Sequence, residues 1–271
     1  MNATPLAAEA IRALLAVSAS HVGIEVVAET GSTNADLLAR VPSAAATAAT
    51  PALRGPLLRV AELQTAGRGR AGRSWLSAPG ASLTFSLAWP FRAPLHRMVG
   101  LPLAVGVAIA ETLGGLGVPV QLKWPNDVLK DGAKLAGILV ETQAAPDGTI
   151  WAVVGCGMNL LMPDELEAAI GRDVSSAPWL AQMDRNALLA QLLNRLCAVL
   201  AEFDDTGFAA FTDRWNALQA WRGQPVRLLD QGAVQQEGLA AGVDEQGRLL
   251  LDTPAGRVAV LSGDVSLRLA P

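Results

Sequence analysis

The sequence predicts an α+β protein, in which a large domain with a mixed or antiparallel sheet and helices precedes a small β-barrel domain. Two observations predict this. In the first 220 residues, six short apolar or alternating runs typical of strands are interspersed with five helical patterns. After Trp221 the chain changes to five short β segments separated by glycines, which is typical of a small barrel. We therefore expect one domain over residues 1–220 and a second over residues 221–271.

The expected elements follow the hydrophobic pattern in chain order. Helices are predicted over residues 6–16, 35–40, 97–113, 186–203 and 208–218. Strands are predicted over residues 22–28, 57–63, 82–89, 118–124, 134–142 and 150–156, and in the second domain over 225–229, 237–243, 249–252, 257–261 and 265–269. Residues 97–113 are apolar on nearly every side of the expected helix, which indicates that this helix is buried in the centre of the core. Residues 42–56 are small and turn-prone and predict an exposed connecting loop.

Composition excludes several classes of protein. With 271 residues, of which 51% are hydrophobic, the chain can bury a large core, and its net charge of −4 argues against a general attraction to nucleic acid or acidic membranes. Its two cysteines, Cys156 and Cys197, have no paired spacing, so neither a zinc site nor a disulfide framework is expected. The longest apolar stretch breaks at Glu111, too early to span a bilayer. We expect a cytoplasmic protein. The sequence does not decide its oligomeric state, and a homodimer is one of the possibilities left open.

The loop between the second and third predicted strands interleaves three arginines with three glycines and ends on a tryptophan, in the run TAGRGRAGRSW over residues 65–75. Glycine lets the backbone approach a ligand closely, and guanidinium groups match carboxylate and phosphate oxygens. The loop therefore predicts an anion site. Without context, a solvated turn or a nucleic-acid contact explains the same residues, although the acidic net charge argues against nucleic acid.

Four other segments share a polar character at the end of an element. They read GSTN over residues 31–34, KWPNDV over 123–128, KLAGILVE over 134–141 and GCGMN over 155–159. Each alone is explained by ordinary structure. Ser32 or Thr33 is suited to cap the helix at 35–40, because a hydroxyl accepts the unpaired N–H groups of a first turn. The other three are compatible with a turn or a strand end.

Together and in this order, the five motifs closely resemble those of the biotin protein ligases, which activate biotin with ATP and attach it to a lysine of a carrier protein. The resemblance covers about residues 30–160. It implies a catalytic domain like that of class II synthetases and a C-terminal SH3-like barrel. It also implies that biotin and ATP are the substrates, that Mg²⁺ is the metal, and that there is no tightly bound prosthetic group. The implied partner is a biotin carboxyl carrier protein or domain.

Some members of the family carry an N-terminal winged helix-turn-helix and repress transcription. About thirty residues precede Gly31, too few for that module, so a monofunctional ligase without DNA binding is expected. The related lipoate and octanoate ligases or transferases are the nearest alternative. Their Arg-Arg and triple-glycine motif is absent here.

The resemblance also implies which residues bind each substrate. Biotin needs polar partners for its ureido ring, an apolar slot for its chain and a cation for its carboxylate. The implied biotin-binding residues are Ser32, Thr33, Asn34, Gln64, Gly67, Arg68, Gly69, Arg70, Trp75, Lys134 and Gly137. The implied ATP or adenylate contacts are Arg68, Arg70, Arg73, Lys123, Asn126, Lys134, Asn159 and Trp179. Trp179 either stacks on adenine or is a core tryptophan.

Three residues are the predicted catalytic set. Lys134 offsets the repulsion between biotin's carboxylate and the α-phosphate of ATP. Arg70 belongs to a lid loop and retains the reactive adenylate. Asp127 orients or deprotonates the acceptor amine, whose unperturbed pKa is roughly 10.4, or binds Mg²⁺ together with Asn126; these alternatives remain open.

Overall fold

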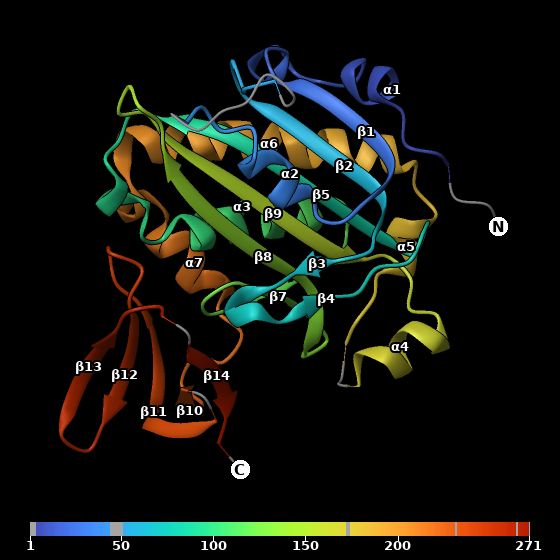
Figure 1. The fold of residues 1–271 in the computed structure, drawn as a ribbon. Helices are drawn as coiled ribbons and strands as arrows, with labels where there is room; N and C mark the ends of the chain where they lie inside the picture. The colour runs from blue at the N-terminus through green and yellow to red at the C-terminus, as the bar shows by residue number, and fades with distance from the viewer. Residues whose placement is uncertain (1–3, 44–50, 172–173, 231, 264, 271) are drawn as a thin grey trace.

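A seven-stranded mixed sheet organises the large domain in the computed structural model, which describes residues 4–43, 51–171, 174–230, 232–263 and 265–270 (Figure 1). The strand order is β1-β2-β5-β9-β8-β7-β6. β1 runs parallel to β2, and every other neighbouring pair is antiparallel. The strands are β1 (Gly23–Thr30), β2 (Leu57–Gln64), β5 (Ser82–Phe91), β6 (Gln121–Lys123), β7 (Asp127–Lys130), β8 (Ala133–Ala144) and β9 (Ile150–Asn159). The predicted mixed sheet is confirmed.

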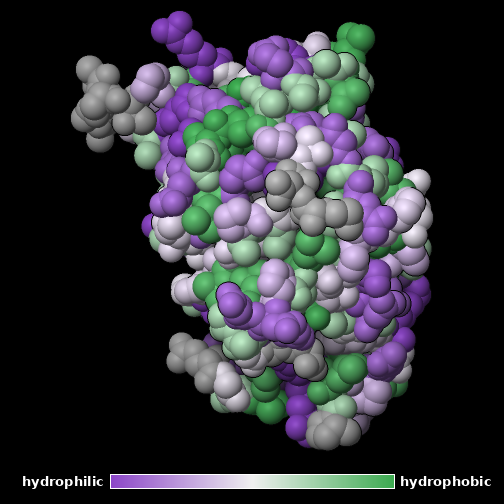
Figure 2. All heavy atoms as spheres, turned by 90° about the vertical axis from the view of Figure 1, so that its right-hand side faces the viewer, coloured by the Kyte–Doolittle hydropathy of each residue, from purple (hydrophilic) through white to green (hydrophobic). Residues whose placement is uncertain are grey.

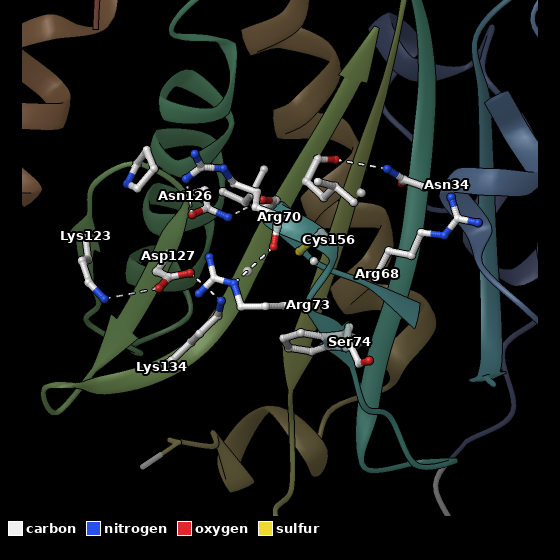
Figure 3. Close-up of a pocket in the computed structure, with 18 of the residues that line it drawn as sticks. Asn34, Arg68, Arg70, Arg73, Ser74, Lys123, Asn126, Asp127, Lys134 and Cys156 are labelled. Atoms are coloured by element: carbon white, nitrogen blue, oxygen red, sulfur yellow. Dashed lines mark hydrogen bonds and ion pairs between the residues drawn. The ribbon is translucent and has the colours of Figure 1, made fainter. Parts of the chain in front are cut away.

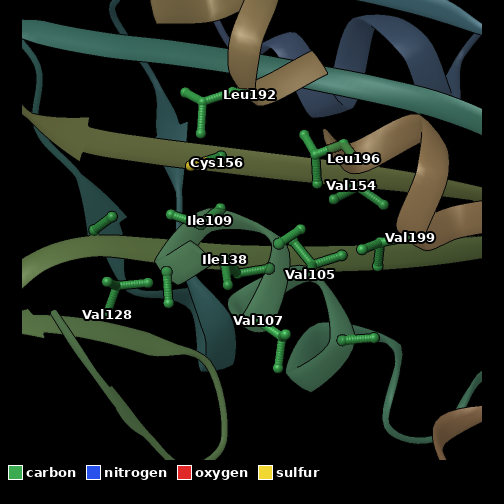
Figure 4. Close-up of a cluster of buried hydrophobic side chains, with 14 of the residues drawn as sticks. Val105, Val107, Ile109, Val128, Ile138, Val154, Cys156, Leu192, Leu196 and Val199 are labelled. Atoms are coloured by element: carbon green, nitrogen blue, oxygen red, sulfur yellow. The ribbon is translucent and has the colours of Figure 1, made fainter. Parts of the chain in front are cut away.

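Two long helices cover one face of this sheet and build the main core. α3 (Leu101–Gly115) packs against α6 (Arg185–Thr206) and β8. Val105 and Ile109 of α3 and Leu196 of α6 lie in this core with Val154 of β9 (Figure 4). The stretch Leu95–Gly115 is long and apolar enough to cross a membrane by length and composition, but 67% of its apolar window is buried within the protein. This burial is typical of a core helix, as the sequence predicts.

The opposite face of the sheet carries the short helix α2 (Thr33–Leu38), which packs on β5 and β9 (Figure 1). Ser32 precedes it as the N-cap, and its Oγ accepts a hydrogen bond from the N–H of Ala35 at 3.4 Å. Below α2 lies a second apolar cluster that includes Leu37 and Leu53. The prediction that residues 42–56 are exposed is therefore wrong at Leu53, which packs under α2; residues 44–50 lie outside the described residues.

Several predicted boundaries are wrong. The helix predicted at 6–16 is α1 (Ala8–Arg12) followed by a turn at residues 13–14, where Leu14 is exposed. The helix predicted from residue 97 begins at Leu101. Of the strand predicted at 118–124, only residues 121–123 form a strand, β6. β7 (Asp127–Lys130) is a further strand that was not predicted; it begins at the last residue of the KWPND turn segment. The short helices α4 (Asp164–Ile170) and α5 (Pro178–Ala181) were not predicted, and the last predicted helix is α7 (Thr212–Leu218).

A five-stranded antiparallel sheet forms the C-terminal region, in the order β13-β12-β11-β10-β14. Its strands are β10 (Pro225–Asp230), β11 (Ala233–Val243), β12 (Leu249–Thr253), β13 (Gly256–Val260) and β14 (Val265–Leu269). Its buried side chains join the main apolar cluster. Trp124, fully buried in the large domain, donates a hydrogen bond from Nε1 to the carbonyl of Gly247 at 3.2 Å. This bond attaches the C-terminal sheet beside the turn that leads into β7.

Candidate functional site

A cleft lies on the α2 face of the sheet, where the N-terminus of α2, the Arg/Gly loop, β7, β8, β9 and the C-terminal strand β14 meet. Most of the predicted site residues line it: Ser32, Thr33, Asn34, Gln64, Arg68, Gly69, Arg70, Arg73, Trp75, Lys123, Asn126, Asp127, Lys134 and Gly137. Asn159 lines an adjoining cleft instead, together with Arg73, Trp75 and Lys134. The structure thus brings together segments that are more than a hundred residues apart in the sequence.

Two predicted site residues do not line either cleft. Gly67 is buried in the short strand β3 (Gly67–Arg68), which pairs with β4 (Ser74–Trp75) and so shapes the loop from behind. Trp179 of α5 is 59% exposed, so the alternative of a core tryptophan is wrong.

The side of the molecule turned toward the viewer in Figure 2 mixes hydrophilic and hydrophobic residues over its whole area.

One end of the main cleft is lined by neutral polar groups. The backbone N–H of Thr33 donates to Oε1 of Gln64 at 2.8 Å, and Thr33 Oγ1 lies 3.0 Å from the same atom. Ser32 caps α2 and also lines the cleft, so the capping role and a binding role are compatible at this residue. Ser86 of β5 lines the same end; sequence reasoning missed it, because a serine within an alternating strand has no motif around it.

The middle of the cleft is a flat floor made by glycines. Gly137 of β8 and Gly157 of β9 are directly paired across the sheet. A methyl group at position 157 would lie 2.6 Å from Cζ2 and 2.7 Å from Nε1 of Trp75, so the indole rests on the bare backbone. A methyl group at position 137 would lie 2.8 Å from Nζ of Lys134. The two glycines let an aromatic wall and a cation lie against the sheet.

The other end of the cleft gathers cations around one carboxylate (Figure 3). Nζ of Lys134 lies 2.5 Å from Oδ1 of Asp127, and Nζ of Lys123 lies 3.6 Å from Oδ2. Arg70 donates to Oδ1 of Asn126 at 3.3 Å and to the carbonyl of Gly263 in the C-terminal region. Because the cations outnumber the carboxylate, this end is suited to an anionic ligand.

Burial lowers the pKa of Lys123 to about 8, and Asp127 opposes that shift. The Lys123 side chain is only 11% exposed and also lies over the ring of Trp221, 5.0 Å from its centroid. Arg268 of β14 lowers the pKa further by charge repulsion. Arg268 lines the cleft, and sequence reasoning missed it because it lies in the other domain, far from every motif.

Two buried polar atoms at the junction of the two clefts lack a hydrogen-bond partner within the described part of the chain: Nε1 of Trp75 and Oδ1 of Asn159. The orientation of the Asn159 amide is fixed by Nδ2, which donates a hydrogen bond to the carbonyl of Ser175 at 3.2 Å. A buried polar group without a partner is costly. Nε1 of Trp75 faces the backbone of Gly157, so of the two atoms only Oδ1 of Asn159, whose residue lines the adjoining cleft, is a candidate partner for a polar ligand.

Comparisons with known proteins decide the family. Residues 40–159 match the Biotin/lipoate A/B protein ligase family, and residues 223–268 match the Biotin protein ligase C terminal domain. A biotin–acetyl-CoA-carboxylase ligase of Mycobacterium tuberculosis is 38% identical over 250 residues, which are 89% of this chain and 88% of that protein. The chain belongs to the biotin protein ligase family.

Other relatives agree with this assignment. The bifunctional ligase/repressor BirA of Escherichia coli is 36% identical over 218 residues, which are 78% of this chain and 66% of that protein. A biotin protein ligase from Aquifex aeolicus, solved in complex with biotin and ATP, has a TM-score of 0.73 and 28% identity, covering 92% of this chain and 99% of that one. The predicted α+β fold with a small C-terminal SH3-like β domain is confirmed.

The residues available for a metal suit a nucleotide-bound Mg²⁺ better than a metal centre made of protein groups alone. Among the described residues there is no group of three His, Cys, Asp or Glu side chains that could hold a metal ion. Asn126 and Asp127 offer one amide oxygen and one carboxylate in the cationic end, and Mg²⁺ would share them with Arg70, Lys134 and Lys123, which contact these oxygens in the structure. Mg²⁺ commonly takes one or two carboxylates and completes its shell with substrate phosphates and water, so the two residues fit that mode.

Replacing Gly157 by alanine is expected to weaken biotin binding between about tenfold and a hundredfold. The added methyl overlaps the Trp75 indole, which must move out of the cleft, and overpacking of this kind costs roughly 1–3 kcal/mol. Isothermal titration with biotin measures the effect. Gly114→Ala is the matched control, because a methyl there meets no atom within 4 Å. Equal biotin affinity in the two variants would contradict the role of Gly157.

The lowered pKa of Lys123 predicts a stability that rises with pH. Between pH 8 and 10.5 the unfolded chain holds this proton and the folded chain does not, so the free energy of unfolding increases through that window, by at most about 3 kcal/mol. Urea unfolding at several pH values measures it. The free energy of unfolding of Lys123→Met should exceed that of the wild type by an amount that shrinks as pH rises from 8 to 10.5. A difference that stays constant over this range would contradict the lowered pKa of Lys123.

Proposed function

We propose that this chain is a biotin protein ligase that converts biotin and MgATP to biotinyl-5′-AMP and pyrophosphate, and then transfers biotin to a lysine of a biotin carboxyl carrier protein or domain. One observation carries the proposal. A single cleft has a neutral hydrogen-bonding end, a flat floor of glycine and tryptophan, and a cationic end, in the order that a ureido ring, an apolar chain and a carboxylate require.

In the first half-reaction, a carboxylate oxygen of biotin attacks the α-phosphorus of ATP, and the bond to the bridging oxygen of pyrophosphate breaks. We propose that Lys134 lies beside both reacting groups and offsets their negative charges. Its ammonium is held at 2.5 Å by Asp127, on a strand of the sheet, so its position costs little reorganisation. Mg²⁺ bound at Asn126 and Asp127 would neutralise phosphate charge there.

In the second half-reaction, the acceptor amine attacks the acyl carbon, the bond between that carbon and the phosphate oxygen breaks, and AMP leaves with the electron pair. We propose that Asp127 orients the amine or takes its proton, which then passes to water. The mixed anhydride must be kept from water until the amine attacks. We propose that Arg70 does this by fastening the Arg/Gly loop to Asn126 and to the C-terminal region. Asn159 is proposed to bind the nucleotide through its unpartnered Oδ1, in the adjoining cleft. Trp179 lines neither cleft, so it would stack on adenine only if the nucleotide extends beyond both of them.

The test is to incubate the purified protein with biotin, MgATP and an apo carrier domain, and to follow pyrophosphate release and the mass of the carrier. We expect both pyrophosphate and a carrier heavier by one biotinyl group. A mass gain with lipoate and none with biotin would overturn the substrate. Salt-sensitive DNA binding without biotin-dependent pyrophosphate release would favour the nucleic-acid alternative.

Both cysteines are free, which fits the inferred cytoplasmic location.

A further inference from the structure

A continuous chain of hydrogen bonds runs behind the neutral end of the cleft. Oγ1 of Thr33 and Oγ of Ser86 are 2.7 Å apart, and Ser86 donates to Oδ1 of Asn34 at 2.5 Å. Nδ2 of Asn34 donates to Oε2 of Glu141 at 2.9 Å and to the carbonyl of Leu139 at 3.3 Å. Thr33, Asn34 and Ser86 are buried, and the chain links α2, β5 and β8.

The chain has a fixed direction, because its last members only accept hydrogen bonds. A carboxylate and a carbonyl oxygen cannot donate, so the amide nitrogen of Asn34 must face Glu141 and Leu139, and its oxygen must face Ser86. Ser86 has a single hydroxyl proton, which it gives to that oxygen. Its own oxygen is then an acceptor toward Thr33.

Thr33 therefore has its proton committed within the protein. Its hydroxyl donates either to Ser86 at 2.7 Å or to Oε1 of Gln64 at 3.0 Å, and both are acceptors in this arrangement. What Thr33 still offers the cleft is a lone pair. A ligand atom placed against it must carry an N–H or O–H group.

The sheet makes room for this chain at a glycine. A methyl group at Gly155 of β9 would lie 2.9 Å from Cγ of Asn34, so the amide fits only because no side chain is present there. Figure 3 shows Asn34 on the side of the pocket away from Lys123 and Asp127. The chain is thus separate from the cationic end that carries the phosphate chemistry.

We propose that Glu141, acting through Asn34 and Ser86, orients Thr33 as a hydrogen-bond acceptor for a ligand N–H, so that Glu141 and Asn34 are positioning residues that select a urea-like head group. The inference rests on the proposed function in one respect, that the head group entering this end is the ureido ring of biotin. Glu141 is outside the set of residues that line the cleft, so its effect on a ligand must pass through the chain.

The test uses two single substitutions and their combination. In Glu141→Gln the terminal group can donate as well as accept, so the direction of the Asn34 amide is held only by the longer hydrogen bond to the carbonyl of Leu139. We expect the KM for biotin to rise about tenfold, the value of one misdirected hydrogen bond, with kcat and the KM for ATP unchanged. In Asn34→Asp two carboxylates face each other, and the KM for biotin should rise further.

The double variant Asn34→Asp/Glu141→Gln restores the direction of the chain from position 141 to Ser86, because the new amide donates and the new carboxylate accepts from it and from Ser86. Only the longer hydrogen bond to the carbonyl of Leu139 is not restored. Its KM for biotin should fall back toward the wild-type value, a rescue that a merely structural role does not predict. Glu29→Gln, an exposed carboxylate on β1, is the matched control. Thermal unfolding of each variant identifies any that is misfolded, and Glu141→Gln, being isosteric, keeps the test decisive.

Biotin whose ureido nitrogens are methylated provides a second measurement. The wild type should discriminate strongly against it, and Glu141→Gln should discriminate less. An unchanged KM for biotin in Glu141→Gln, equal rises in the KM for biotin and ATP, or no rescue in the double variant would overturn the inference. These results differ from failure of the proposed function, in which the wild type itself would neither bind biotin nor release pyrophosphate in its presence.

Discussion

Replacing Lys134 by alanine is expected to slow pyrophosphate release from biotin and ATP by roughly 100- to 1000-fold, the usual loss when one positioned electrostatic donor is removed. The ammonium of Lys134 lies 2.5 Å from Oδ1 of Asp127 and over the backbone of Gly137, on the floor of the cleft. Without it, the repulsion between the carboxylate of biotin and the α-phosphate is offset less, because the cation held nearest the floor of the cleft is missing. Rapid-quench measurement of biotinyl-AMP in the absence of carrier isolates this step.

Lys130→Ala is the matched control for that experiment. Lys130 is in β7, four residues before Lys134, but its ammonium pairs with Asp131 and it does not line the cleft. We expect it to adenylate biotin at the wild-type rate. Lys134→Arg keeps the charge but replaces a compact ammonium by a planar fork, so it should recover only part of the activity. A normal adenylation rate in Lys134→Ala would remove the role assigned to this residue.

The motifs predicted most of the cleft because strand alternation places them on one face. Asp127, Gly137, Gly157 and Thr84 form one row across β7, β8, β9 and β5. Their neighbours Val128, Ile138 and Cys156 belong to the main core. A two-residue period is readable in sequence, so the side of the sheet on which a motif residue lies follows from the apolar residues beside it.

What the sequence could not supply is the contribution of segments without a motif. Arg268 reaches the cleft because β14 of the C-terminal sheet lines it together with residues of the large domain, an arrangement that no local pattern encodes. Ser86 and Glu141 belong to strands whose polar positions look solvated, and only the packing of α2 on that face buries Ser86 and Asn34. β7 has four residues, too few for its alternation to be separated from the turn before it.

Replacing Arg70 by glycine is expected to leave adenylate formation active but to let the adenylate escape, so that biotin appears on proteins other than the carrier. Arg70 lies at the tip of the Arg/Gly loop and donates to Asn126 and to the carbonyl of Gly263. These bonds connect the loop to the turn before β7 and to the C-terminal region. Glycine removes both and adds backbone freedom to the loop, which favours its open form.

The measurement separates retention from chemistry. After one turnover without carrier, rapid filtration gives the fraction of biotinyl-AMP that stays with the protein, and a bystander protein with exposed lysines reports what escapes. The wild type should retain nearly all of it, and Arg70→Gly should release most while pyrophosphate formation continues. Arg54→Gly, which removes an exposed arginine outside both clefts, is the matched control. If Arg70→Gly still holds the adenylate and labels only the carrier, the loop is not what shields it; if pyrophosphate formation stops instead, Arg70 acts in the chemical step, beside Lys134.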